Sequence, residues 1–405
     1  IVCGRGSGIH EDKKIFGIAN NVFYAGVTSF FTDISTKMIY SIMPLFLLSI
    51  GASKTSIALI EGIAESTASL IKAFSGYWSD KIGKNKPFLI IGYGITALVT
   101  PLYTFVYLPI HVLLLRFIER IGKGIRTAPR DSLIAGSIKQ GKTGINFGFH
   151  KAMDNSGAII GPLIAFCLLS FCTLDYTDIF LISSIPAFIG VVTITMFIHE
   201  KKTNVKKNSA TVPLKQLPKR FYFFLFVVFI FTLGNSADAL LLVKTTETGI
   251  AQKYIPFVYM IFNCVSVFLA IPIGKLSDKI GREILIIFGF IVYSVVYFLF
   301  GKLDGIYPFI GLFALYGLYS ALCDGNQKAL VSDIIGKDLK GTGFGLYHAI
   351  LGITLLPASL IAGLLYDNVN SDAPFYFGSL MAMLSVILMI IFVISKPKKQ
   401  IINKD

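Results

Sequence analysis

Apolar residues form long, nearly unbroken runs along this chain of 405 residues, and short polar stretches separate them. A helix needs about 20 apolar residues to cross the hydrocarbon core of a bilayer, and the runs are near or above that length. The pattern predicts an all-α membrane protein with twelve transmembrane helices, at about residues 17–49, 55–79, 86–107, 110–136, 143–171, 178–198, 220–246, 253–275, 284–301, 305–333, 341–366 and 374–395.

The longest polar interruption lies in the middle of the chain. Residues 199–219 are rich in lysine and contain Pro213 and Pro218. Such a stretch does not continue either flanking helix, so it is typical of a linker. We expect an N-terminal six-helix bundle over residues 1–198, a linker over 199–219 and a C-terminal six-helix bundle over 220–405.

Lysine and arginine are divided unequally between the two sets of loops. The set that includes both termini and the linker carries 24 of them, whereas the opposite set carries Lys54, Lys253 and Lys302. Cytoplasmic loops of membrane proteins hold the excess of basic residues. The pattern therefore predicts a multi-pass protein of the inner (plasma) membrane, with both termini and the linker in the cytoplasm.

Composition excludes several other classes of protein. Charged residues make up 15% of the chain, against about 25% in a soluble domain. The net charge of +14 is explained by the cytoplasmic loops, so no nucleic-acid partner is expected. The five cysteines are scattered without metal-binding spacing, and we expect no metal site. Neither a P-loop nor a nucleophile–base pair is evident, so we expect no enzyme activity and no cofactor.

Two stretches of sequence repeat at nearly the same spacing. "GYWSDKIGK" begins at Gly76 and "GKLSDKIGR" at Gly274, an offset of 198 residues. "FGFHKA" begins at Phe147 and "FGLYHA" at Phe344, an offset of 197 residues. A shared offset across separate stretches indicates two duplicated six-helix units, an arrangement common in transporters.

The first repeated stretch resembles a signature of the major facilitator superfamily, G-x-x-x-D-[RK]-x-G-[RK]. The fourth predicted helix, with "GKGIRTAPRDSLIAG", resembles one bacterial and archaeal branch of that superfamily. The resemblance implies two pseudo-symmetric six-helix bundles that alternate access to a central site. It also implies that the signature loops help to hold the cytoplasmic side shut, which gives as gating residues Gly76, Asp80, Lys81, Gly83, Lys84 and, in the second copy, Asp278.

The fourth predicted helix carries an unusual number of charges. At about 100° per residue, they fall within an arc of roughly 140° and so form one polar stripe. Lipid would not accommodate that stripe, so it must face the bundle interior or a water-filled cavity. Its members are Arg116, Glu119, Arg120, Lys123, Arg126, Arg130 and Asp131.

Other helices of the N-terminal half have polar faces that can meet this stripe. Together the half contains eight interior cations, which are Lys37, Lys72, Arg116, Arg120, Lys123, Arg126, Arg130 and Lys151. It contains six interior carboxylates, which are Asp33, Glu61, Glu65, Glu119, Asp131 and Asp154. The C-terminal half is sparser in charge, so the predicted site is asymmetric.

Two interpretations of these charges remain open. The ions can pair with one another and stabilise the bundle, or some cations can meet an anionic substrate while a carboxylate carries protons. For substrate binding, the candidates are Arg116, Arg120, Arg126, Tyr40, Asn235 and Asn326. For proton coupling, the candidates are Asp33, Glu61, Glu65 and Asp154. Arg130 is a gating candidate that can pair with Asp80.

The sequence favours a secondary active transporter that moves a small polar or anionic organic solute by alternating access. The expected partners are that solute, protons and membrane lipids, and we expect a monomer. A siderophore or another metal chelate is one candidate substrate. The stretch "GAIIGPLIAF" from Gly157 resembles an antiporter pattern of the superfamily, so a proton-antiport multidrug efflux pump is the alternative. A transporter-like solute sensor is a third hypothesis.

The unequal distribution of basic residues generates a test of orientation. A cysteine introduced at Asn208, in the linker, should be protected from an impermeant thiol reagent in intact cells, because the linker is predicted to be cytoplasmic. A cysteine at Asn370, in an opposite loop, should react. Labelling at position 208 with none at position 370 would reverse the predicted topology.

Overall fold

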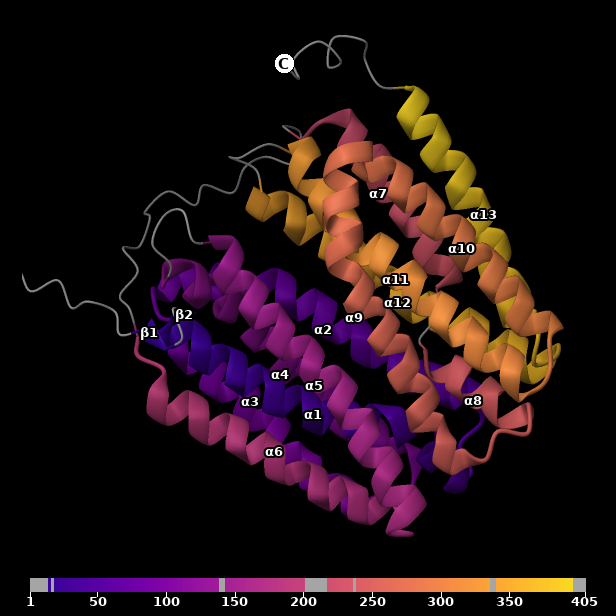
Figure 1. Cartoon of the computed structure of the whole chain (residues 1–405), viewed down its shortest axis with the longest axis horizontal. Coiled ribbons are helices and arrows are strands. Elements are labelled where there is room, and N and C mark those ends of the chain that lie inside the picture. The colour runs from indigo at the N-terminus through magenta and orange to yellow at the C-terminus, as the bar shows by residue number, and fades with distance from the viewer. Residues whose placement is uncertain are drawn as a thin grey trace, which may run out of the picture.

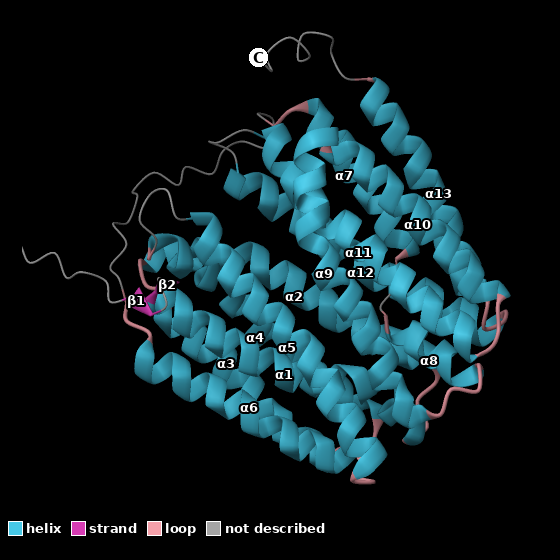
Figure 2. Cartoon of the chain, in the orientation of Figure 1, coloured by secondary structure: helices cyan, strands magenta, loops and turns pink. Residues whose placement is uncertain are grey.

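The computed structural model describes residues 14–15, 18–137, 143–200, 217–235, 238–335 and 340–395, and nearly all of them are helical (Figure 1, Figure 2). The first group of helices comprises α1 (Asn20–Ser49), α2 (Lys54–Ile82), α3 (Lys86–Val99), η1 (Thr100–Phe105), α4 (Pro109–Gly136), α5 (Thr143–Phe171) and α6 (Tyr176–Phe197). A short antiparallel pair, β1 (Lys14–Ile15) and β2 (Ile18–Ala19), precedes α1.

The second group follows the linker and lies beside the first (Figure 1). It comprises α7 (Lys219–Gly234), α8 (Ala239–Glu247), η3 (Gln252–Tyr254), α9 (Ile255–Ile280), α10 (Arg282–Lys302), α11 (Ile306–Ile335), α12 (Lys340–Asn368) and α13 (Ala373–Ile394). Since α3 continues into η1, and α7 and α8 are two parts of one crossing segment, the prediction of twelve transmembrane helices in two bundles is confirmed. The linker falls mostly on residues 201–216, outside the described residues, so its boundaries stay a prediction.

Local signals explain where several helices begin and end. The Ser53 side chain accepts the Ser56 amide hydrogen at the start of α2, and Asp175 forms a capping box at the start of α6. Gly83, with a φ of 69°, ends α2 in the left-handed conformation that glycine adopts without strain. These caps fix where α2 and α6 begin and where α2 ends.

Nine helical segments of the described chain are long and apolar enough to cross a membrane by length and composition. The long helices outside this set are α1, α2 and α4. They carry most of the interior charges predicted above, so their low hydropathy reflects a polar interior face.

The two bundles have different interiors. In the second bundle, aromatic rings fill the space between helices: Phe231 stacks on Phe290 with centroids 4.1 Å apart, and Tyr293 stacks on Tyr297 at 4.0 Å. In the first bundle, glycines bring α4 close to its neighbours. A Cβ at Gly92 of α3 would lie 2.6 Å from the Gly122 carbonyl oxygen of α4. Small residues thus let α4 pack closely against α3, and Gly124 does the same against Ile71 of α2.

The two bundles meet mainly along α2 with α12 and along α5 with α9. Among the described residues, the hydrogen bonds between bundles include Lys37 to Tyr259, Ser66 to Gly352, Thr55 and Lys54 to Asp367, and Tyr176 to Gln252. All of them lie in the middle of the bundles or at the end where α2 begins. The bundles are therefore joined at that end.

Candidate substrate and coupling site

Arg116 of α4 lies at the centre of a buried ion-pair cluster. Its Nε and Nη2 atoms donate to the two carboxylate oxygens of Glu61 on α2, at 2.9 and 2.5 Å. Its Nη1 atom donates to Glu119 at 3.0 Å, and the Tyr103 hydroxyl donates to the same carboxylate. The side chains of Arg116 and Glu61 are each 1% exposed. This two-pronged geometry is the strong form of an arginine–carboxylate pair.

Arg120 lies one helical turn further along α4 and extends the cluster. Its Nη2 atom is 2.9 Å from Glu65 of α2 and 4.0 Å from Glu61. Two of the predicted substrate-binding arginines, Arg116 and Arg120, are therefore paired with two of the predicted proton-coupling glutamates. These pairs fix α4 against α2.

A second cluster joins α1, α4 and α5. The Arg130 guanidinium is 3.2 Å from Asp131 and 3.7 Å from Asp154 of α5, and it donates to the Ser29 hydroxyl at 3.1 Å. His150 also contacts that hydroxyl, at 3.2 Å. The structure thus gives Arg130 acidic partners on α4 and α5. Its predicted partner Asp80 has a side chain outside the described residues, so that pairing stays a prediction.

Arg126 differs from the other arginines of α4. Its Nη1 atom donates to the Thr96 hydroxyl at 2.6 Å and to the Gly92 carbonyl at 3.4 Å. Its guanidinium carbon lies 4.3 Å from the centre of the Tyr93 ring. Among the described side chains no carboxylate oxygen lies within 4 Å of its guanidinium, even though the residue is buried, with only 5% of it exposed. Arg126 is therefore a buried cation held by neutral groups and an aromatic face.

Lys37 of α1 is a second cation without an acidic partner within 4 Å in the described part of the chain. Its Nζ atom donates to the Tyr259 hydroxyl of α9 at 3.1 Å, across the boundary between bundles. It also lies over the rings of Tyr40 and Tyr259, at 5.3 and 5.5 Å. The predicted substrate residue Tyr40 is thus placed beside this lysine.

Two carboxyl groups approach each other near these cations. Asp33 of α1 is within hydrogen-bonding reach of Asp154 of α5, and its charge interacts with those of Lys37 and Arg126. Two neighbouring carboxylates repel each other when both are ionised, and a proton shared between them relieves this repulsion. The structure thus brings together two of the four predicted proton-coupling residues.

The second bundle contributes polar groups set among tyrosines. Asn235 lies at the interruption between α7 and α8, where its amide donates to the Tyr319 hydroxyl at 3.2 Å. Asp238, at the other side of the interruption, accepts from Tyr316 at 2.8 Å. The amide of Asn326 donates to a backbone carbonyl of its own helix, at Leu322. Asn235 therefore borders the aromatic surface, whereas Asn326 is partly satisfied inside α11.

The two signature loops differ in their surroundings. In the first copy, Lys81 and Lys84 are exposed, and the Asp80 side chain lies outside the described residues. The Glu200 carboxylate there accepts the amide hydrogens of Asn85 and Lys86 at the start of α3.

In the second copy, Arg282 joins Asp278 at 3.3 Å and Asp333 at 2.5 Å. Both partners belong to the second bundle. The second loop is therefore tied within its own bundle.

Sequence reasoning missed several partners in these clusters. Tyr93, Thr96 and Tyr259 contact predicted interior cations but are separated from them by long stretches of chain. Glu200 accepts backbone amide hydrogens just after the first signature loop, at Asn85 and Lys86. An aromatic or hydroxyl residue in a transmembrane helix looks the same in the sequence whether it contacts a cation or only packs against a neighbouring helix. Glu200 follows the last helix of its bundle without any capping pattern.

Comparison with known proteins identifies the family. A family model of the Major Facilitator Superfamily matches residues 25–244 and again residues 224–405. The chain belongs to the major facilitator superfamily. It is accordingly a membrane transporter and not an enzyme, and the family expected from the signature loops is confirmed.

Relatives across nearly the full length agree with this family. A protein of Methanocaldococcus jannaschii, described as an uncharacterized MFS-type transporter, is 35% identical over 92% of this chain and 95% of its own length. The multi-drug resistance efflux pump PmrA of Streptococcus pneumoniae is 24% identical over 78% of this chain and 82% of the pump. The chain is thus similar both to an uncharacterized transporter and to a drug efflux pump, so these relatives do not indicate one substrate.

Solved structures share the fold. The nucleoside transporter NupG superposes with a TM-score of 0.70 at 14% identity, covering 93% of this chain and 98% of NupG. A POT family transporter in complex with 5-aminolevulinic acid gives a TM-score of 0.78 at 12% identity, covering 96% of this chain and 98% of the other. At these identities the likeness concerns the fold alone.

The Arg116 cluster generates a prediction of stability for this major facilitator protein. Arg116→Met should lower the free energy of unfolding by about 3–5 kcal/mol, because Glu61 and Glu119 would remain buried with too little positive charge. Lys151→Met removes a pair whose lysine is 69% exposed and should cost less than about 1 kcal/mol. Unfolding in detergent measures both, and equal stability of the two variants would contradict the structural role. Adding Glu61→Gln to Arg116→Met should recover part of the loss.

Proposed function

We propose that this superfamily member is a proton-coupled carrier of small organic anions, and that Arg126 and Lys37 bind the anionic group. The observation that carries the proposal is the contrast within one bundle. Arg116, Arg120 and Arg130 have carboxylate partners. Among the described side chains, four other interior cations have none within 4 Å, which are Lys37, Lys72, Lys123 and Arg126. Of these four, Arg126 is buried and Lys37 contacts the second bundle, so these two are the candidates. A cation that is buried without an acidic partner favours an anionic ligand that replaces the missing charge.

The paired arginines take a structural role in this proposal. Arg116 and Arg120 hold α2 against α4, and Glu61 and Glu65 supply their charge balance. A substrate would have to break a buried two-pronged pair to reach Arg116, which is strongly unfavourable. The guanidinium of Arg126 donates to neutral groups through Nη1 and has further N–H groups that can donate to a carboxylate or phosphate oxygen.

The surroundings support an organic anion over a small inorganic ion. Tyr40 and Tyr259 lie beside Lys37 with their ring centres 5.4 Å apart, and Phe262 stacks on Tyr316 at 5.0 Å. Aromatic faces of this kind contact planar or apolar parts of a ligand, while the nearby hydroxyl and amide groups fix its orientation. A solute with one anionic end and an organic body would match the cations with the first part and the aromatic rings with the second.

The position of Asp33 supports the proposed coupling to protons. When ionised, this carboxylate partly neutralises Lys37 and Arg126, with which its charge interacts. A proton on Asp33 or its neighbour Asp154 removes negative charge and leaves the cations free for an anion. By linkage, the bound anion in turn favours the proton, so both are carried together.

The arrangement of the bundles fits one state of an alternating-access cycle. The hydrogen bonds between bundles lie in the middle and at the end where α2 begins, which the distribution of basic residues predicts to be outside. With that orientation, the outer side is closed. The gating roles of Asp80, Lys81 and Lys84 belong to the opposite, cytoplasmic closure.

Efflux of lipophilic drugs is the second candidate. The similarity to PmrA and the aromatic interior of the second bundle favour it. The cations without acidic partners oppose binding of cationic drugs. Flux in proteoliposomes distinguishes the two: under an imposed pH gradient, organic anions should be concentrated and lipophilic cations should not. Concentration of the cations alone would replace the proposed function by drug efflux.

Arg126 should contribute to affinity without contributing much to stability. Once a transported anion is found, Arg126→Lys should weaken its binding by about 1.5–3 kcal/mol, because lysine replaces the planar fork by a point charge. Arg116→Lys is the matched control, and it should destabilise the protein while leaving the affinity nearly unchanged. Calorimetry with thermal unfolding measures both quantities. Normal affinity in Arg126→Lys, combined with lost stability, would make this arginine structural.

Asp33 should set the pH dependence of binding. In the unaltered protein, affinity for the anion should rise as pH falls, because protonation frees the cations. Asp33→Asn mimics the protonated carboxyl, so its affinity should be high and nearly independent of pH, and uphill transport driven by a pH gradient should be lost. Asp178→Asn, at the start of α6, is the control. If the pH profile of Asp33→Asn is unchanged, a group other than Asp33 carries the proton.

A further inference from the structure

Helices α2 and α12 come from different bundles and pack as a close antiparallel pair. Gly62, Gly352 and Gly363 leave room for this contact: a Cβ at Gly62 would lie 2.6 Å from the Ser359 side chain. One at Gly352 would lie 2.9 Å from Leu70. The Ser66 hydroxyl donates to the Gly352 carbonyl at 2.5 Å. The close packing of α2 against α12 therefore continues toward the start of α2.

At that end, a carboxylate of α12 covers the first turn of α2. Asp367 accepts the Thr55 amide hydrogen at 2.8 Å and also the amide hydrogen of Lys54. The first amide groups of a helix have no partner within the helix, and the helix dipole is positive there. Ser53 occupies the usual capping position, so Asp367 adds a cap from the opposite bundle.

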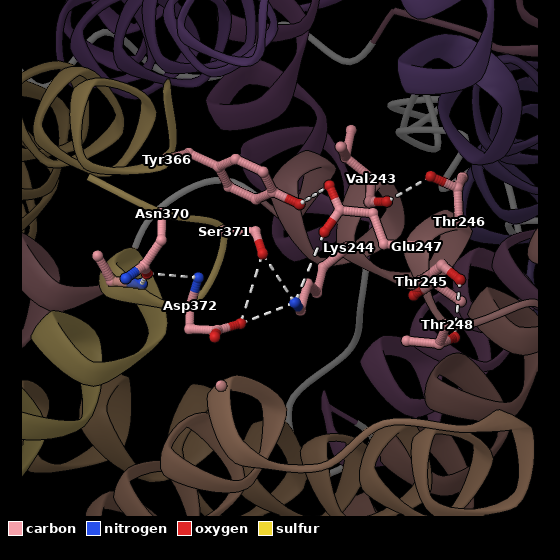
Figure 3. A network of polar contacts seen from close by, with 12 residues as sticks. Val243, Lys244, Thr245, Thr246, Glu247, Thr248, Tyr366, Asn370, Ser371 and Asp372 are labelled. Atoms are coloured by element: carbon pink, nitrogen blue, oxygen red, sulfur yellow. Dashed lines mark hydrogen bonds and ion pairs between the residues drawn. The ribbon is translucent and has the colours of Figure 1, made fainter. Parts of the chain in front are cut away.

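A network inside the second bundle fixes this end of α12 (Figure 3). The Tyr366 hydroxyl donates to Glu247 of α8 at 2.8 Å. Lys244 of α8 is 5% exposed and lies 2.7 Å from Asp372 and 3.6 Å from Glu247. The network thus ties the end of α12 to α8, the short helix that follows the interruption beside the proposed substrate site.

We infer that Asp367 is the outer latch of the transport cycle, the contact that holds the outside shut and must break when the outside opens. The inference rests on the alternating access of the proposed function. Asp367 is exposed and crosses between bundles, so its contact can be broken and remade, whereas the buried Lys244 network lies within one bundle and moves as a unit. Asp367 would thus hold the outer side shut, as Asp80 is predicted to hold the cytoplasmic side shut. Asp80 lies in the last turn of α2, at the other end of the same helix pair.

The substitution series Asp367→Asn and Asp367→Lys tests the latch. Asparagine keeps an acceptor oxygen but loses the negative charge at the positive end of α2, so it should shift the ratio of outside-closed to outside-open molecules by about twofold to fivefold. A lysine should shift it further, because its charge is repelled by the positive end of α2. The control is Asp304→Asn, which removes an exposed carboxylate from the α10–α11 turn on the same face.

The state is read by spin–spin distances across each face of the full chain, after its five native cysteines are replaced. Cysteines at Tyr107 and Tyr307 report the outer face, since both residues are exposed and belong to different bundles. Cysteines at Lys84 and Lys279 report the cytoplasmic face. The latch variants should lengthen the outer distance and shorten the inner one, in the order Asn then Lys, and the control should do neither.

Unchanged distances in both variants would overturn the latch. Flux in proteoliposomes is measured on the same samples. If the unaltered chain transports and the variants keep its distances, the latch alone fails. If the distances respond while no solute is moved under any gradient, the latch stands and the proposed cargo fails.

Discussion

The buried pair of Arg116 with Glu61 is the interaction on which the rest of the first bundle depends. A charge inside a bilayer is tolerated when a partner or water compensates it. Here hydrogen bonds from Arg116 and Tyr103 converge on Glu61 and Glu119, and so join α2, α4 and η1 in a space from which water is excluded. The pair fixes the rotation of α4, and that rotation directs Arg126 toward α3. Because the stripe is continuous, the same helix carries both the paired arginines and Arg126, the cation proposed to bind substrate.

The asymmetry of the two bundles follows from the same constraint. The first bundle concentrates ions, which demand fixed partners, whereas the second concentrates tyrosines, which can contact a ligand without needing a counter-charge. The cation at the boundary, Lys37, is held by Tyr259 of the second bundle. An anion bound there would contact both bundles, and this is the position from which a ligand can bias their relative movement.

Much of the fold could be predicted from the sequence, because apolar run length and helical spacing act locally. The twelve helices, the two bundles and the inward-facing stripe of α4 all follow from those two properties. The pairing of the charges could not be predicted in the same way. Glu61 is separated from Arg116 by 55 positions, and the choice between candidate partners depends on glycine contacts such as Gly92 with Gly122. The sequence shows more interior cations than interior carboxylates in the first bundle. It does not show which of these cations lack a carboxylate partner.

A structure determined with a transported solute bound tests the central claim most directly. The account predicts that an anionic group of the solute lies within hydrogen-bonding distance of Arg126 or Lys37, that the organic body contacts Tyr40 or Tyr259, and that the Arg116–Glu61 pair stays closed. A solute that opens the Arg116–Glu61 pair, or one that binds away from both Arg126 and Lys37, would contradict the division of this charged interior into a structural part and a substrate-binding part.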